Sequence, residues 1–244
     1  MTVLRVTAVQ ASYVLMDRDA TIGRVAELTA AAAREGAQLV VFPEVFVPGT
    51  PVWIDTQPIW DGDEDWFAPL AQNAVVVGGP ASDRLAAIAA EHGVWLVVGV
   101  EEREERGATI YNTVLYFSPS GTLAGRHRKL VPTGSEPLHA DQVPAGFPAR
   151  ARLLAPGYLE HNGPWLEEGN TVIVAPDGAV LAGPVREREE TLVLDLDLRT
   201  VAAARRYLDP VGHYNRPDIF RLCVDTSSRP AVIETPLNQL RSPS

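Results

Sequence analysis

Two short segments of the sequence place a carboxylate and a lysine directly after predicted strands. Phe42-Pro43-Glu44 puts a glutamate at the end of an apolar strand, and the carboxyl ends of strands commonly line a ligand crevice. Because Pro43 stops the strand, Glu44 must turn out of the sheet, where burial would raise its pKa and make it a usable general base. Lys129 follows a second strand and could stabilise developing negative charge. Taken alone, Glu44 also fits a strand-end backbone cap and Lys129 a solvated surface lysine.

No other residue offers a clear nucleophile or metal ligand. The single cysteine, Cys223, cannot form an internal disulfide or a structural zinc site. We interpret it as a small buried or edge thiol of a predicted strand at residues 219–224. Ser135 lacks the glycine-bounded turn and the assignable histidine of a serine nucleophile. The run 101–106 alternates glutamates with arginines, which favours a solvated hairpin loop over a metal site.

The elements that must position Glu44 form two predicted βαβ units. The first has a strand at 4–11, a helix capped by Asp17 or Asp19 and ended by Gly36, and a buried strand at 38–42. The second has a helix opened by Ser82 and stopped by Gly93, followed by a buried strand at 95–100. This alternation is typical of an α/β fold.

Hairpins follow the two units and make the predicted sheets mixed. One pairs strands 113–117 and 122–126, and another pairs strands 171–175 and 179–182. An alternating strand follows at 191–196, and Asp197 caps a short helix that extends through residue 204. Between residues 132 and 165 the chain is rich in glycine and proline and has no periodic apolar segment. A structureless stretch of that length inside a compact domain indicates that something is missing there.

Composition restricts the class of protein. With 244 residues, 46% of them apolar, the chain can bury the core of a single domain. Its net charge of −10 disfavours nucleic acid as a partner. The longest apolar run is far below the roughly 20 residues of a membrane span, and the first residues lack the pattern of an export signal. We therefore expect a cytoplasmic protein with no nucleic-acid or membrane partner.

Several further motifs, in a fixed order along most of the chain, carry a resemblance to a known family. They are Ala8–Ala11, Val41–Glu44, Phe46–Trp53, Tyr111–Thr113, Gly125–Thr133, Gly169–Ile173, Pro176–Gly178, Ala182–Pro184, Gly212–Tyr214 and Arg216–Asp218. Each motif is weak alone, but in this order they are highly specific. Together they resemble the nitrilase family of carbon–nitrogen hydrolases.

The resemblance implies a fold, a reaction and site residues. The fold would be a four-layer α-β-β-α sandwich with mixed sheets. In such enzymes a cysteine thiolate attacks a small-molecule nitrile, ammonia leaves, and the resulting thioester is hydrolysed to a carboxylic acid, with no cofactor and no metal. By resemblance Glu44 would be the general base, Lys129 would stabilise the anionic intermediate, and Glu136 would be an additional carboxylate near the site. Trp53 would border the substrate pocket, although simple loop packing explains it equally well.

The chain departs from this family where the nucleophile should be. The family carries its cysteine in a Cys-Trp-Glu sequence downstream of the lysine motif. Here Glu136–His139 passes directly to Ala140–Pro144, which resembles the segment well beyond that cysteine. We therefore expect a single nitrilase-like domain, residues 1–244, internally shortened near 139–141, with an incomplete sandwich.

Three interpretations remain open. The leading one is a nitrilase-type hydrolase that lacks the thiol and is therefore inactive. The second is a non-catalytic partner that co-assembles with an intact nitrilase, and the third is an active enzyme whose sequence as written has lost an internal segment that its gene encodes. Reading the encoding DNA across His139–Asp141 would separate the third from the others. Since a missing strand exposes apolar surface and a sheet edge, we also expect a homo-oligomer.

Overall fold

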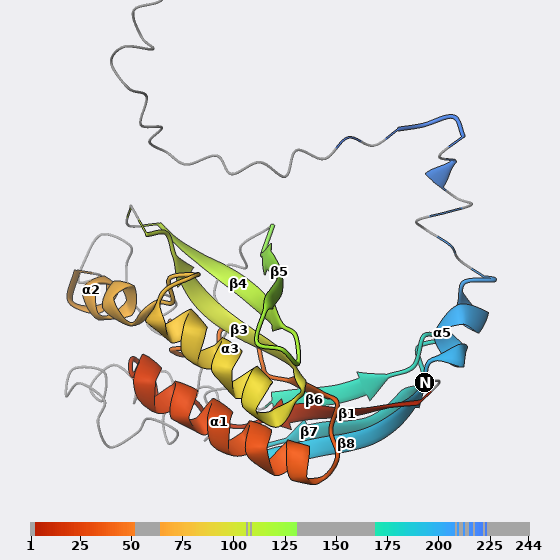
Figure 1. Cartoon of the computed structure of the whole chain (residues 1–244), viewed down its shortest axis with the longest axis horizontal. Coiled ribbons are helices and arrows are strands. Elements are labelled where there is room, and N and C mark those ends of the chain that lie inside the picture. The colour runs from red at the N-terminus through yellow and green to blue at the C-terminus, as the bar shows by residue number, and fades with distance from the viewer. Residues whose placement is uncertain are drawn as a thin grey trace, which may run out of the picture. The chain divides into compact units, whose positions relative to one another are not determined.

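The computed structural model describes residues 3–51, 64–105, 107, 109–130 and 169–207, together with 209, 212, 215–216, 218–221 and 223. Trp53, Glu136 and the expected shortening near 139–141 lie outside these residues. The chain forms two compact units, Met1–Ala202 and Ala203–Ser244. The architecture below is that of the first unit (Figure 1).

A six-stranded mixed sheet forms the centre of the first unit. Its strands are β1 (Val3–Gln10), β2 (Leu39–Val41), β3 (Trp95–Arg103), β4 (Ile110–Phe117), β5 (Leu123–Arg128) and β8 (Glu190–Asp197). Their order across the sheet is β5-β4-β3-β2-β1-β8. β2 is parallel to both β1 and β3, as the two βαβ units predict, whereas β4, β5 and β8 add antiparallel pairs.

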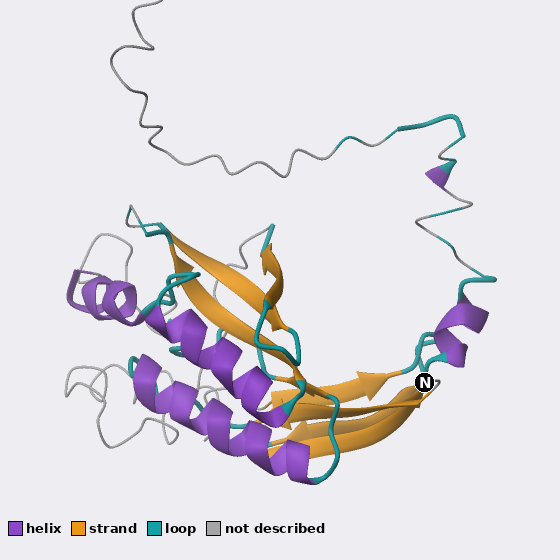
Figure 2. Cartoon of the chain, viewed as in Figure 1, coloured by secondary structure: helices purple, strands orange, loops and turns teal. Residues whose placement is uncertain are grey.

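Two helices lie side by side over one face of this sheet (Figure 2). They are α1 (Arg18–Arg34) and α3 (Pro80–His92). The Asp17 side chain caps α1 by accepting a hydrogen bond from the backbone N–H of Ala20, at 2.9 Å. Gly93 ends α3 in the left-handed conformation, with φ of 63°. The core lies between these helices and the strands, and its most fully buried members include Ile22, Val25, Val40, Leu85, Leu96 and Leu115.

A β-hairpin lies on the opposite face of the sheet. It consists of β6 (Gly169–Val174) and β7 (Val180–Arg186) and lies against β1 and β8. Gln10, which faces away from the helices, accepts a hydrogen bond from the backbone N–H of Thr171 at 3.0 Å. The described part of the unit therefore has three layers: helices, the six-stranded sheet and the hairpin. The mixed α/β class predicted from the sequence is confirmed.

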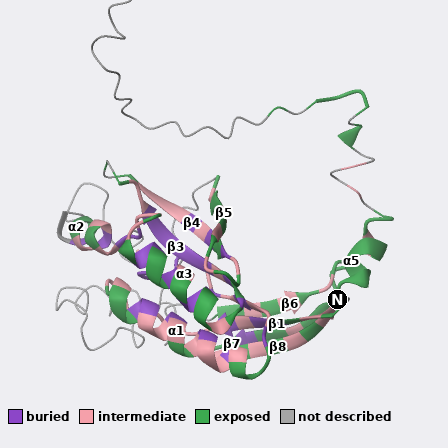
Figure 3. Cartoon of the chain, in the orientation of Figure 1, coloured by how far each residue is buried: buried purple, intermediate pink, exposed green. Residues whose placement is uncertain are grey.

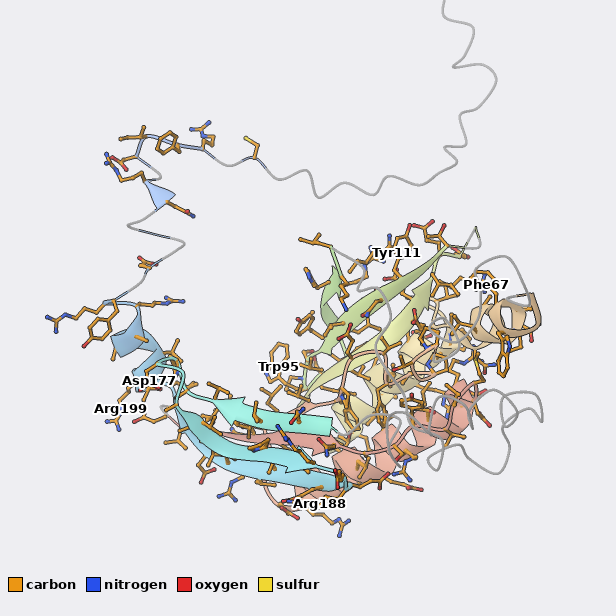
Figure 4. All side chains as sticks on the ribbon, turned by 180° about the vertical axis from the view of Figure 1, so that it is seen from behind. Phe67, Trp95, Tyr111, Asp177, Arg188 and Arg199 are labelled. Atoms are coloured by element: carbon orange, nitrogen blue, oxygen red, sulfur yellow. The ribbon has the colours of Figure 1, made fainter. Side chains whose placement is uncertain are left out.

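Several apolar residues of the sheet and the hairpin remain exposed; Figure 3 colours each residue by its burial. On β3 and β4, Trp95 is 42% exposed and Tyr116 is 37% exposed. Trp95 projects away from α1 and α3 (Figure 4). On the hairpin, Val172 and Val174 are also exposed. None of the described helices is long and apolar enough to cross a membrane.

Four details differ from the sequence analysis. The helix α2 (Glu64–Asn73) was not predicted. α3 begins at Pro80, two residues before Ser82, because proline fits the first turn of a helix. β3 extends through Arg103, so that Glu101 and Glu102 lie in a strand and not in a solvated loop. The described residues among 219–224 contain no strand, and Ile219 and Phe220 instead close a turn by donating backbone hydrogen bonds to Arg216.

The short C-terminal helix was correctly predicted. It is α5 (Arg199–Ala204), and the Asp197 side chain accepts a hydrogen bond from the backbone N–H of Arg199 at 3.0 Å. This is the capping interaction expected of an aspartate that precedes a helix.

Candidate functional site

A bulge after β2 places Glu44 outside the sheet. The backbone N–H of Gly99 donates to the carbonyl of Pro43 at 3.2 Å, and the carbonyl of Gly99 accepts from the N–H of Val47 at 3.1 Å. The three residues 44–46 therefore have no partners on β3 and are pushed out of the ladder. Phe46 fixes the bulge, because its side chain is fully buried and its ring centroid lies 5.2 Å from that of Phe42.

Gly99 is required for this close approach. A Cβ at this position would lie less than 3.0 Å from backbone atoms of Pro43, Glu44 and Val45. Any other residue would force the bulge away from β3, since these atoms belong to the backbone and cannot rotate aside.

Three polar residues on neighbouring strands form a row beside the bulge. Glu101 on β3 is directly opposite Asn112 on β4. The backbone N–H of Lys129, one residue after β5, donates to the carbonyl of Asn112 at 2.8 Å. Directly opposite residues in antiparallel strands point to the same face of a sheet. Glu101, Asn112 and Lys129 therefore share the face on which Glu44 leaves the sheet.

Glu44 and Lys129 are in direct contact. Lys129 Nζ lies 2.6 Å from Glu44 Oε1, and the Asn112 side chain donates a hydrogen bond to the same oxygen. Among the described residues none donates a hydrogen bond to Oε2. Both side chains are partly exposed, at 46% for Glu44 and 31% for Lys129. The structure thus brings together the carboxylate and the lysine that the sequence analysis placed after two different strands.

The pKa of Glu44 differs from the expectation that burial alone would raise it. Partial burial does act in that direction, but hydrogen bonds from Lys129 and Asn112 and the charge of Lys129 outweigh it, so that the pKa lies below its ordinary value. Glu44 is thus held as an ionised carboxylate. It is correspondingly a weaker base than a buried glutamate without these partners.

A cluster of charges on the opposite face of β3 anchors β5. Glu102 is only 2% exposed and accepts hydrogen bonds from Arg126, Arg128 and Thr113. The shortest of these joins Arg128 Nη2 to Glu102 Oε1 at 2.6 Å. Burial acts to raise the pKa of Glu102, but these bonds and the two guanidinium charges hold it below the ordinary value. Since β5 is an edge strand, this cluster helps to fix the segment that ends in Lys129.

Cys223 does not belong to the unit that carries Glu44 and Lys129. It lies in the Ala203–Ser244 unit and is exposed, so the expected buried or edge thiol of a strand is wrong. Within the part of the chain that the structure describes, no group of three His, Cys, Asp or Glu side chains could hold a metal ion.

Sequence reasoning missed two members of the site, Glu101 and Asn112. The charged run at 101–106 suggested solvent exposure, yet Glu101 is 6% exposed. The alternation of β3 was the available signal, because Glu101 follows Gly99 by two residues and must share its face. Asn112 belonged to a family motif, but its register opposite Lys129 required the pairing of β4 with β5.

A family model described as carbon–nitrogen hydrolase matches residues 5–151, which include Glu44, Glu101, Asn112 and Lys129. The chain belongs to the carbon–nitrogen hydrolase family. Among curated relatives of this hydrolase, it is 30% identical to Nitrilase 2 of Arabidopsis thaliana over 304 aligned positions, covering 92% of this chain and 89% of that protein. It is 32% identical to an aliphatic nitrilase of Sinorhizobium fredii over 310 positions, covering 96% and 99%.

Solved structures of carbon–nitrogen hydrolases share the fold. A carbon–nitrogen hydrolase from Helicobacter pylori aligns with a TM-score of 0.59 and 16% identity, covering 90% of this chain and 97% of that one. Nit3 of Saccharomyces cerevisiae, a member of branch 10 of the nitrilase superfamily, aligns with a TM-score of 0.55 and 19% identity, covering 88% and 97%. These similarities support the nitrilase-like α/β architecture.

Proposed function

We propose that this chain is a nitrilase-type hydrolase by descent. It binds a small nitrile at the Glu44–Lys129 pair but forms no covalent intermediate with it and does not hydrolyse it. The observation that carries the proposal is the 2.6 Å contact between Lys129 and Glu44 in a chain whose only cysteine, Cys223, lies outside any Cys-Trp-Glu sequence. The carboxylate and the lysine of the family motif are kept, whereas the thiol is not.

The missing thiol matters because the reaction depends on it. A thiolate forms a bond to the nitrile carbon while the nitrogen gains a proton, and water then displaces ammonia before a second water releases the acid. Without the sulfur no covalent intermediate forms, and Glu44 can only orient water against an unactivated nitrile. Removing the nucleophile of a hydrolase leaves only the residual rate due to binding and polarity.

The length of the alignments supports an internal shortening, which we assign to residues 139–141 from the order of the sequence motifs. The alignment with the Arabidopsis protein has 304 positions, which is 60 more than the 244 residues of this chain. At least 60 residues of the Arabidopsis protein are therefore aligned with gaps in this chain. A block of this size is large enough to hold a strand, a nucleophile loop and a helix. In the shortened site, Glu136 would still supply a second carboxylate and Trp53 would border the nitrile.

A second candidate function is a non-catalytic assembly partner. Trp95 and Tyr116 are exposed on the sheet face away from the helices, and Val172 and Val174 are exposed on the hairpin. Apolar surface of this kind favours association with another chain. We propose that it joins copies of this chain in a homo-oligomer, or joins this chain to an intact nitrilase, in the cytoplasm.

The test is ammonia release by the purified full chain from aromatic and aliphatic nitriles. We expect release no faster than from a sample of the Glu44→Gln variant, because neither protein can form the thioimidate. Turnover by the natural chain that disappears in Glu44→Gln would contradict the proposal. Turnover that disappears in Cys223→Ala would overturn it most directly, by identifying Cys223 as the nucleophile.

A further inference from the structure

Glu101 is a buried carboxyl group that the nitrilase reaction does not use. It lies in the row with Asn112 and Lys129, on the sheet face that Glu44 overhangs. Its backbone is held on the edge of β3 away from β4: the N–H of Glu101 donates to the carbonyl of Val47 at 2.8 Å, and its carbonyl accepts from the N–H of Val75 at 2.7 Å. The side chain therefore cannot leave the site without disrupting the strand.

The surroundings of Glu101 disfavour a negative charge. Burial raises its pKa to about 7, and the neighbouring charge of Glu44 acts in the same direction. Among the described residues no cation forms an ion pair with Glu101, in contrast to Glu102, the next residue on the opposite face, whose charge two arginines balance. Lys129 contacts the other carboxylate of this face, Glu44.

We propose that Glu101 is a positioning residue of this site, whose carboxyl keeps the proton so that Glu44 alone carries the negative charge and pairs with Lys129. The inference rests on the proposed function in that Glu44 is taken as the group that faces the ligand. Glu101 is then a third titratable residue of the site, and the net charge of the site depends on pH.

The net charge of the site follows from this arrangement. In weakly acidic solution the negative charge of Glu44 and the positive charge of Lys129 cancel, and Glu101 is neutral. Above neutral pH Glu101 loses its proton, and the site gains a negative charge that competes for Lys129 and repels Glu44. Other titratable or charged residues on this face are Arg103 on β3, Tyr116 on β4, His127 on β5 and Glu190 on β8. His127 is exposed and lies two residues before Lys129, so a variant without its imidazole belongs to the test.

Lys129 gives a direct readout because it is the only lysine of the sequence. In the full chain labelled with ¹³C-lysine, the Cε carbon gives one signal, which can be followed from pH 5 to pH 9 without a ligand. We expect this signal to shift with a midpoint of about 7 as Glu101 ionises. The shift should be lost in Glu101→Gln, which keeps the size of the side chain, and kept in the control Glu91→Gln, an exposed acid on α3.

Two further variants keep the test decisive. In Glu44→Gln the midpoint should move to lower pH, because removing the neighbouring charge makes Glu101 easier to ionise, and this holds even if Glu101→Gln does not fold. In His127→Gln the midpoint should stay in place. A flat Lys129 signal in the natural chain, or a shift that survives Glu101→Gln or disappears in His127→Gln, would overturn the inference. Because no nitrile is present, failure of the proposed function would leave these outcomes unchanged.

Discussion

At the scale of single residues, adjacent glutamates on β3 have opposite electrostatic environments. Glu101 and Glu102 are both almost fully buried, at 6% and 2% exposure. The alternation of a strand sends one toward Glu44 and the other toward Arg126 and Arg128. Burial favours the neutral form of both, but only Glu102 has cations that reverse the effect. Position within the strand therefore decides which of the two keeps its charge.

The raised pKa of Glu101 predicts how stability depends on pH. The folded protein binds this proton more tightly than the unfolded chain, so the contribution of Glu101 to stability is fully present below pH 4.5 and is lost as the pH rises to about 7. The loss is roughly 3 kcal/mol, since each pKa unit corresponds to about 1.4 kcal/mol. In Glu101→Gln the loss should disappear, so that the variant is more stable than the natural chain at pH 8.

Urea unfolding between pH 5 and pH 8 measures this difference. Glu44 and Glu102 have lowered pKa values, so their contributions are present above their unfolded values and are lost only as the pH falls through their folded values. The contributions of Glu44 and Glu102 therefore stay constant between pH 5 and pH 8, whereas that of Glu101 changes in this range. Parallel pH profiles for the natural chain and Glu101→Gln would refute the assignment.

At the scale of elements, the bulge after β2 depends on the missing side chain of Gly99. A Cβ there would lie under 3.0 Å from three backbone atoms of residues 43–45. Gly99→Ala should therefore destabilise the fold by about 1–3 kcal/mol and displace Glu44 from Lys129. The matched control is Gly23→Ala in α1, where a Cβ meets nothing within 4 Å. This change should stabilise the helix by roughly 0.5–1 kcal/mol.

Thermal unfolding and the Lys129 carbon signal measure both effects. Gly99→Ala should lower the melting temperature and shift the signal, whereas Gly23→Ala should raise the melting temperature and leave the signal in place. Equal behaviour of the two variants would show that the close approach at Gly99 does not position Glu44.

The elements themselves were largely accessible from the sequence. Local signals predicted α1 from its Asp17 cap and the β4–β5 hairpin from its turn at residues 118–121. The burial of Glu101 and Glu102 was not accessible, because charge pattern alone indicates solvent and their partners lie more than ten residues away in other strands. The strand predicted at 219–224 failed because its apolar side chains have no described neighbours to pack against, and Phe220 remains exposed.

At the scale of the whole molecule, the first unit has one helix-covered face and one incompletely covered face. Trp95 and Tyr116 lie on the second face, and β5 is an edge strand. The net charge of −10 provides repulsion between copies but does not cover the apolar surface. This combination favours association at physiological salt, where charge repulsion is screened beyond about 8 Å.

Sedimentation velocity tests this expectation. We expect the natural chain to form concentration-dependent oligomers, and Trp95→Ser to weaken them, because the change removes exposed apolar area without altering the core. The control Phe67→Ser removes an aromatic side chain that is 40% exposed on α2 and lies well away from Trp95 (Figure 4). A monodisperse monomer over a wide concentration range, with no binding of an apolar dye, would contradict the expected association.

The most direct test of the account follows the nitrile carbon itself. Benzonitrile labelled with ¹³C at the cyano carbon is mixed with the full chain and observed by NMR over hours. We expect the cyano signal to persist, to be broadened by exchange with the protein, and to regain its free linewidth when Lys129→Met replaces the natural chain. New carboxylate or amide carbon signals that grow with time would contradict the central claim that this chain binds a nitrile without hydrolysing it.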